Sequence, residues 1–144
     1  MTIAAILKHK GRNVVHVDPT ARIVDVAALL TGQKIGAVLV MDRAGSLMGI
    51  LSERDIVNEI AVCGARALEM TAAQLMTTQV KLVSPSTGIE EAMAMMTAGR
   101  FRHLPVTDGG VLIGIVSIGD VVKRLIVDKS QEVDSLKAYV AGAA

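Results

Sequence analysis

The chain has 144 residues, of which 51% are hydrophobic, and its mean hydropathy is +0.50. A chain of this length and hydrophobicity can bury a core, which excludes intrinsic disorder. The net charge is only +1, and the aromatic residues are limited to Phe101 and Tyr139. Both values argue against nucleic-acid binding, because that function requires a basic excess or aromatic rings on which bases stack.

The chain also lacks the signals of secretion, membrane insertion and metal binding. A single cysteine, Cys63, cannot form a disulfide within the chain, and three scattered histidines do not complete a zinc motif. The apolar stretch at residues 3–7 is followed by basic residues, the reverse of a signal peptide. No apolar run approaches the roughly 18 residues of a membrane span. We therefore expect a cytoplasmic protein with no metal site and no membrane contact.

An internal duplication organises the sequence. Residues 16–42 align with residues 82–108 at an offset of 66, and residues 49–57 align with residues 114–122 at an offset of 65. Identical residues recur along both alignments, among them Pro19 with Pro85 and Asp42 with Asp108. The duplication predicts two repeats, at residues 1–66 and 67–144. Because a unit of this size has a marginal core alone, we expect the two repeats to pack together.

Each repeat is predicted to contain a strand, a helix, two strands and a second helix, in that order. In the first repeat, strand patterns at residues 14–17, 36–41 and 47–51 accompany a helical period at residues 23–31. In the second repeat, the strands are predicted at residues 80–83, 103–107 and 111–116, and the helix at residues 89–98. Gly32 and Gly99 are expected to end the two helices. The fold class is therefore a mixed α/β (α+β) fold of two pseudo-symmetric β-α-β-β-α repeats.

The final helix carries a further pattern. From Val122 onward, apolar residues follow an alternating spacing of four and three, which is typical of a seam between helices. One position within this seam, Lys129, is charged. The seam is expected to contact a second copy of the chain. The alternative is that the helix covers its own repeat.

A motif of the form Gly-Ile-x-Ser-x-x-Asp occurs once in each repeat, at residues 49–55 and 114–120. Ser-x-x-Asp at the start of a helix is typical of a capping box, in which both side chains accept hydrogen bonds from backbone N–H groups. The same geometry suits a ligand, because a helix N-terminus holds phosphate oxygens and a nearby carboxylate accepts hydrogen bonds from a ribose diol. The spacing favours capping, and the two roles are compatible.

The segments FRHLPV at residues 101–106 and GIVSIGD at residues 114–120, with their counterparts in the first repeat, resemble the tandem CBS-domain pairs, named for cystathionine beta-synthase. The resemblance covers essentially the whole chain. It implies that the two repeats pack through their sheets into one compact module. It also implies two clefts that bind adenosine-containing ligands such as AMP, ADP, ATP, NAD(H) or S-adenosylmethionine, and a homodimer.

The resemblance further implies which residues bind the ligand. The carboxylates on the ribose hydroxyls would be Asp55 and Asp120, and the hydroxyls near phosphate would be Ser52 and Ser117. The residues that wall the adenine would be Arg12, Asn13, Val14, Thr78, Gln79 and Val80. The backbone segments at the base edge and sugar would be Ile35, Gly36, Ala37 and Val38 in the first repeat, and Phe101, Arg102, His103 and Leu104 in the second.

Phosphate-binding cations would come from Arg54, Arg102 and His103. His103 is equally compatible with a packed core histidine. The first repeat has Gly36 and Ala37 where the second has Arg102 and His103, so the two sites are not expected to be equivalent.

The sequence therefore predicts a regulatory module that senses adenine nucleotides or dinucleotides and performs no catalysis. One alternative is a small nucleotide-processing enzyme, although no nucleophile with a neighbouring base can be identified in the sequence. Another alternative is a structural dimer with empty clefts. As a module without an attached effector domain, the protein is expected to act on an effector protein in trans.

Overall fold

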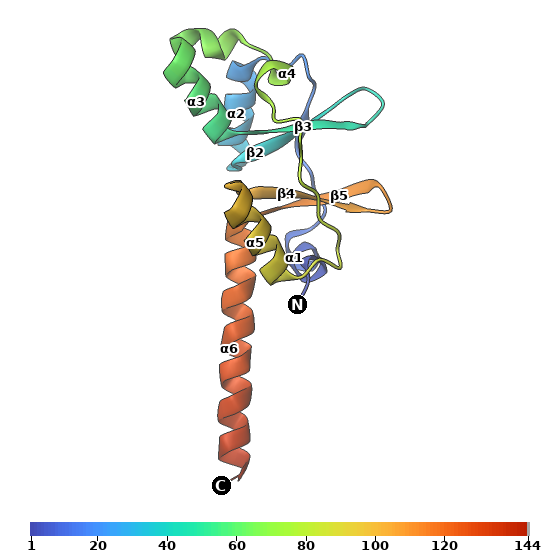
Figure 1. Ribbon diagram of the computed structural model, residues 1–144, viewed down its shortest axis with the longest axis vertical. Helices are drawn as coiled ribbons and strands as arrows, with labels where there is room; N and C mark the ends of the chain where they lie inside the picture. The colour runs from blue at the N-terminus through green and yellow to red at the C-terminus, as the bar shows by residue number, and fades with distance from the viewer. Residues whose placement is uncertain (144) are drawn as a thin grey trace. The chain divides into compact units, whose positions relative to one another are not determined.

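The computed structural model describes residues 1–143 and divides into two compact units (Figure 1). The central unit is Val14–Val80, and the terminal unit joins Met1–Asn13 to residues 81–143. The N-terminal segment thus packs with the second half of the duplication. The repeat boundary between residues 66 and 67 was drawn from the duplication, and it remains a prediction.

The central unit contains the predicted order of elements. A three-stranded sheet is formed by β1 (His16–Val17), β2 (Ala37–Met41) and β3 (Leu47–Ser52), in the order β1-β2-β3. The helices are α2 (Ile23–Gln33), α3 (Glu53–Cys63), the short 3-10 helix η1 (Gly64–Glu69) and α4 (Ala72–Leu75). β1 pairs with β2 in parallel, and β2 pairs with β3 in antiparallel fashion.

The core of the central unit lies between α2 and the sheet. Ile23, Val26 and Leu30 recur at helical spacing on one face of α2 and are buried. They share one hydrophobic cluster with buried residues of β2 and β3, including Val38 and Leu51. An apolar stripe of this period directs one face of the helix to the core, so the apolar period at residues 23–31 correctly predicted this helix.

The terminal unit repeats this plan with one strand reduced. It contains α1 (Ile3–Lys10), α5 (Ile89–Gly99), β4 (His103–Asp108), β5 (Val111–Ser117) and α6 (Ile118–Ala143). β4 and β5 pair in antiparallel fashion. Its core joins Ile3 and Leu7 of α1 to Met96 of α5 and to Leu104 and Val116 of the two strands.

The strand predicted at residues 80–83 is present as a single parallel bridge between Val83 and Val106. In the central unit, Leu39 donates its backbone N–H to the Val15 carbonyl at 3.2 Å and so extends the pairing of β1. The equivalent residue in the terminal unit is Pro105. Because proline has no backbone N–H, the matching hydrogen bond cannot form and the ladder is shorter.

The two predicted glycine stops lie before the residues that close the helices. Gly32 lies within α2, and Gly99 is the last residue of α5. The residues in the left-handed conformation are Lys34 and Arg100, each with a φ of 56°. The Lys34 backbone N–H donates to carbonyls of the preceding turn, as does that of Arg100. These hydrogen bonds offset the cost of a left-handed non-glycine residue.

The repeated Gly-Ile pair has a packing role. A Cβ at Gly49 would lie 2.7 Å from the Thr77 carbonyl oxygen, which belongs to a bridge with β3. A Cβ at Gly114 would lie 2.7 Å from Leu7 Cδ2 of α1. In each unit, glycine therefore lets a preceding or following segment lie directly against the last strand.

Within residues 1–143, none of the helices combines the length and hydrophobicity that crossing a bilayer requires.

Candidate functional site: two strand-to-helix turns

The turn between β3 and α3 forms a complete capping box. The Ser52 backbone N–H donates to Asp55 Oδ2 at 2.8 Å, and the Asp55 N–H donates to Ser52 Oγ at 3.2 Å. The Ser52 hydroxyl also lies 2.9 Å from Asp55 Oδ2. These contacts fix the carboxylate beside the positive end of α3, where a negative charge is stabilised.

The turn between β5 and α6 has the same geometry. The Ser117 N–H donates to Asp120 Oδ2 at 2.8 Å, and the Asp120 N–H donates to Ser117 Oγ at 3.2 Å. The capping interpretation of Ser-x-x-Asp is therefore confirmed in both repeats. Each turn also holds a hydroxyl and a carboxylate at the N-terminus of a helix, the arrangement that suits a phosphorylated sugar.

The backbone segments predicted to meet the ligand lie beside these turns. In the central unit, Glu53 donates its N–H to the Gly36 carbonyl at 2.9 Å, and Ala37 pairs with Ser52. In the terminal unit, Ile118 donates to the Arg102 carbonyl at 2.8 Å, and His103 pairs with Ser117. The fold thus brings each predicted backbone segment to the turn of its own unit.

Several of the predicted residues have side chains that belong to the cores. Ala37, Val38 and Leu104 are buried in their own units. Phe101 is partly buried and packs against the core of the terminal unit. These four residues would meet a ligand through backbone atoms, as the prediction for their segments specified. Ile35 is also partly buried against the core of the central unit.

The predicted adenine-binding segments fall in different surroundings. Thr77 and Ile50 form an antiparallel bridge and exchange two backbone hydrogen bonds, at 2.9 and 3.0 Å. Residues 78–80 therefore leave β3 in the direction of Gly49 and not of Ser52. Thr78 and Gln79 are exposed, and Val80 is partly buried. Of the other predicted segment, the exposed residues 12 and 13 belong to the terminal unit, and residue 14 begins the central unit.

A lysine that sequence reasoning did not identify contacts the second turn. Lys10 Nζ lies 2.6 Å from Asp120 Oδ2. Burial alone would raise the pKa of the Asp120 carboxyl, but the hydrogen bonds from Lys10 and Ser117 outweigh it and hold the pKa below the usual 3.8. The two residues are 110 positions apart, and no local spacing predicts their contact.

Basic side chains surround Asp120. A hollow of about 540 Å³ in the terminal unit is lined by Ile6, His9, Lys10, Asp120, Lys123, Arg124, Val127 and Gln131. Four of these eight residues carry basic side chains, so the hollow suits an anionic group. The cations predicted for phosphate are elsewhere on the turns: Arg54 and Arg102 are exposed, and His103 is partly buried.

The central unit has a smaller hollow at a different place. It has a volume of about 470 Å³ and lies between the end of α2 and the start of α3; its lining includes Lys34, Ile35, Gly36 and Glu53 but neither Ser52 nor Asp55. Among residues 1–143, no three His, Cys, Asp or Glu side chains gather where they could hold a metal ion.

Comparison with known proteins identifies the family. The CBS domain model matches the chain twice, at residues 9–62 and 72–127. The mitochondrial CBS domain-containing protein CBSX3 of Arabidopsis thaliana is 34% identical over 98% of this chain and 72% of its own length. The crystal structure of a CBS-domain-containing protein from Agrobacterium tumefaciens is 43% identical, with a TM-score of 0.83 over 85% of this chain and 91% of its own.

A crystal structure of CBSX2 in complex with AMP is 29% identical, with a TM-score of 0.70 over 89% of this chain and 98% of its own. Both the resemblance and the fold class drawn from the sequence are confirmed by these matches. Two CBS domains account for most of the sequence, and the chain belongs to the CBS domain family.

Proposed function

We propose that this protein is a regulatory module that binds an adenosine-containing ligand such as AMP, ATP or NAD(H) at its two strand-to-helix turns. The observation that carries the proposal is the duplicated turn itself: a Ser hydroxyl, an Asp carboxylate and a helix N-terminus recur with the same hydrogen-bond distances in both units. The proposed contacts are Asp55 and Asp120 with ribose hydroxyls, and Ser52 and Ser117 with phosphate.

The electrostatics of the terminal unit support a phosphorylated ligand. The basic hollow at Asp120 would attract phosphate, and Asp120 itself would accept hydrogen bonds from the ribose. The relative CBSX2 was crystallised with AMP, which supports the same ligand class here. The two turns would differ in affinity, because the central unit has Gly36 and Ala37 where the terminal unit has Arg102 and His103.

The same proposal covers the remaining predictions. The protein would signal by occupancy rather than by catalysis, and it would act on an effector protein in trans. A homodimer is supported by apolar residues exposed at equivalent places, Val57 at 62% in the central unit and Val122 at 40% in the terminal unit.

We keep a cytoplasmic location as a prediction, although the Arabidopsis relative is named as mitochondrial.

The test is a calorimetric titration of the full chain with AMP, ATP, NADH and S-adenosylmethionine. The Asp120→Ala and Asp55→Ala substitutions are each expected to weaken binding at their own turn about ten- to hundredfold, the typical worth of hydrogen bonds to a charged group. The double substitution should weaken every bound ligand in this way.

Gln74→Ala is the control for the loss of a helix cap without the loss of a ligand contact. Thr71 and Gln74 form a capping box at α4, with the Thr71 N–H 2.9 Å from Gln74 Oε1, and no ligand is proposed there. Gln74→Ala should lower the melting temperature comparably without changing affinity. If the parent binds none of the four ligands, or if the double variant binds as tightly as the parent, the proposal is wrong.

A further inference from the structure

The C-terminal half of α6 exposes an apolar stripe that its own unit does not cover. Val121 is buried and Leu125 packs against the terminal core, but residues 129–142 are exposed along their whole length. Within this stretch Val133, Leu136 and Val140 are 50%, 64% and 61% exposed. Figure 1 shows the helix continuing well past α1 and α5 of its unit.

Residues 129–142 contribute no side chain to the terminal core. An isolated helix shorter than about 12 to 15 residues is marginal in water, because helical stability in proteins comes mostly from packing of an apolar face. The apolar residues here are not scattered but continue the spacing that begins at Val122. The stripe therefore needs a partner outside its own unit.

The spacing assigns these residues to the two core positions of a heptad repeat. Ile126, Val133 and Val140 occupy the first core position, called a, and Val122, Lys129 and Leu136 occupy the second, called d. All three a residues are β-branched, and Leu136 occupies one of the three d positions. Among parallel coiled coils, β-branched residues at a with leucine at d favour two strands.

The charges beside the stripe also favour a second copy in parallel orientation. Glu132 lies at the flanking position g, and Lys137 at the flanking position e. In a parallel pair, g of one helix faces e of the other five residues further on, so Glu132 meets Lys137 of the second copy twice by symmetry. An antiparallel pair instead brings g against g and e against e, so Glu132 and Lys137 of the two copies do not meet.

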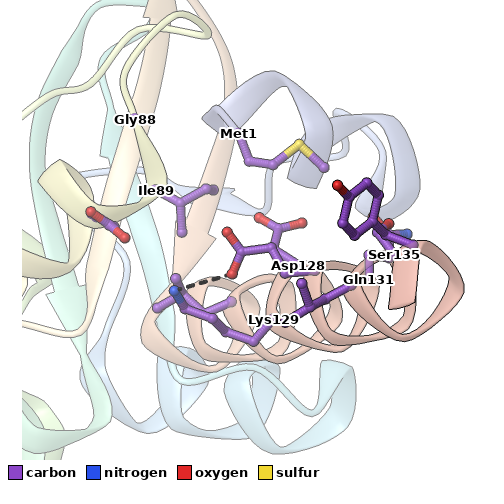
Figure 2. Close-up of a pocket in the computed structure, with 12 residues that line it drawn as sticks. Met1, Gly88, Ile89, Asp128, Lys129, Gln131 and Ser135 are labelled. Atoms are coloured by element: carbon purple, nitrogen blue, oxygen red, sulfur yellow. Dashed lines mark ion pairs between the residues drawn. The ribbon is translucent and has the colours of Figure 1, made fainter. Parts of the chain in front are cut away.

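A groove borders the same stripe on its g side. It has a volume of about 960 Å³ and runs between α6 and the segment formed by Met1 and the start of α5 (Figure 2). Leu136 and Tyr139 line it, together with three acidic residues, Glu90, Asp128 and Glu132, and one basic residue, Lys129. The e edge of the helix, in contrast, carries lysines at positions 123 and 137. An acidic edge beside a basic edge is complementary to a second copy laid in the same direction.

We propose that α6 pairs with α6 of a second copy as a parallel two-stranded coiled coil over residues 122–140. The proposal stands apart from nucleotide binding, since no residue of either ligand turn takes part in it. Lys129 would be the one charged residue in the seam. Its Nζ lies 3.5 Å from Glu132 Oε2 of the same helix (dashed in Figure 2), and the two side chains are 69% and 73% exposed. A charged residue at a core position fixes register at a cost in stability.

The test is the dimer dissociation constant of full-length charge variants, measured by sedimentation. Glu132→Lys and Lys137→Glu should each weaken the dimer about fivefold to thirtyfold, because two attractive pairs become repulsive. An equimolar mixture of the two variants should regain the parent's affinity as heterodimers. Asp134→Lys makes the same charge change as Glu132→Lys at an outward position, and it should leave affinity unchanged. Equal effects of Glu132→Lys and Asp134→Lys would overturn the proposal.

Orientation is tested separately by cross-linking in a Cys63→Ser background. Val140→Cys places thiols at facing core positions of a parallel pair, so mild oxidation should give a covalent dimer. Ala138→Cys lies on the outer face and is the matched control. If both variants cross-link at the same rate, or if neither does, the helices are not paired in parallel and the proposal fails.

Discussion

The contact between Lys10 and Asp120 links the capping of α6 to the N-terminal helix. A carboxylate whose pKa is lowered in the folded state stabilises that state above its unfolded pKa, and the contribution is lost as pH falls through the folded pKa. The pKa of Asp120 lies below 3.8, so its contribution should persist at mildly acidic pH and disappear under more acidic conditions.

Lys10→Met is therefore expected to raise the pKa of Asp120 and to shift acid unfolding to higher pH. The hydrogen bond from Ser117 remains in the variant, so the pKa should not reach that of a buried carboxyl without partners. The measurement is the carboxyl carbon chemical shift of Asp120 against pH, with acid unfolding followed by circular dichroism. Lys8→Met removes a neighbouring charge and is the control. Identical Asp120 titrations in parent and Lys10→Met would show that the ion pair does not form in solution.

At the scale of elements, two glycines near helix ends occupy opposite environments. A Cβ at Gly32 of α2 would meet nothing within 4 Å, whereas a Cβ at Gly99 of α5 would lie 1.8 Å from Phe101 Cε1. Phe101 in turn packs against the core of the terminal unit. The close approach of the ring therefore explains glycine at residue 99, whereas no contact explains it at residue 32.

Alanine substitutions at these two positions should change stability in opposite directions. Gly32→Ala should stabilise the protein by about 0.5 to 1 kcal/mol, because alanine loses less conformational entropy in a helix. Gly99→Ala should destabilise it by about 1 to 3 kcal/mol, because the Phe101 ring must leave its place. Urea denaturation of both variants measures the difference. Equal and stabilising effects would mean that the ring moves aside without cost.

At the scale of the whole molecule, the two units contain the same turn, but the Asp carboxylates of the two turns have different partners. Asp120 is held by Lys10 at 2.6 Å, while the Asp55 carboxylate accepts hydrogen bonds from Ser52 of its own turn. A ribose hydroxyl that donates to Asp120 competes with the lysine. The turn of the terminal unit is thus expected to bind a neutral nucleoside less well than its geometry alone allows.

Lys10→Met should consequently tighten adenosine binding at the turn of Asp120 by up to about fivefold, the worth of a partly exposed ion pair. Binding at the turn of Asp55 is the internal control and should not change. Site-resolved affinities come from the NMR signals of residues in each turn during an adenosine titration. Weaker adenosine binding in the variant would show that Lys10 supports the ligand rather than competing with it.

The sequence by itself determined the local order of this protein. Apolar periods of 3.6 and 2, repeated at a constant offset, were sufficient to predict α2, α5 and β1 to β5, because such periods report which face of an element is buried. The helices α1, η1 and α4 were not among the predicted elements. The capping boxes at Ser52 and Ser117 were equally predictable, since both partners lie within one turn of helix.

The tertiary structure alone decided the features that depend on residues distant in the chain. The ion pair of Lys10 joins residues that are 110 positions apart. The steric restriction at Gly99 depends on where the Phe101 ring packs. The loss of a backbone hydrogen bond at Pro105 depends on which segment lies beside it. Local spacing cannot encode these features, because packing sets the distance between segments. The exposed stripe of α6 combines both levels: its period is visible in the sequence, but its lack of cover is visible in the fold.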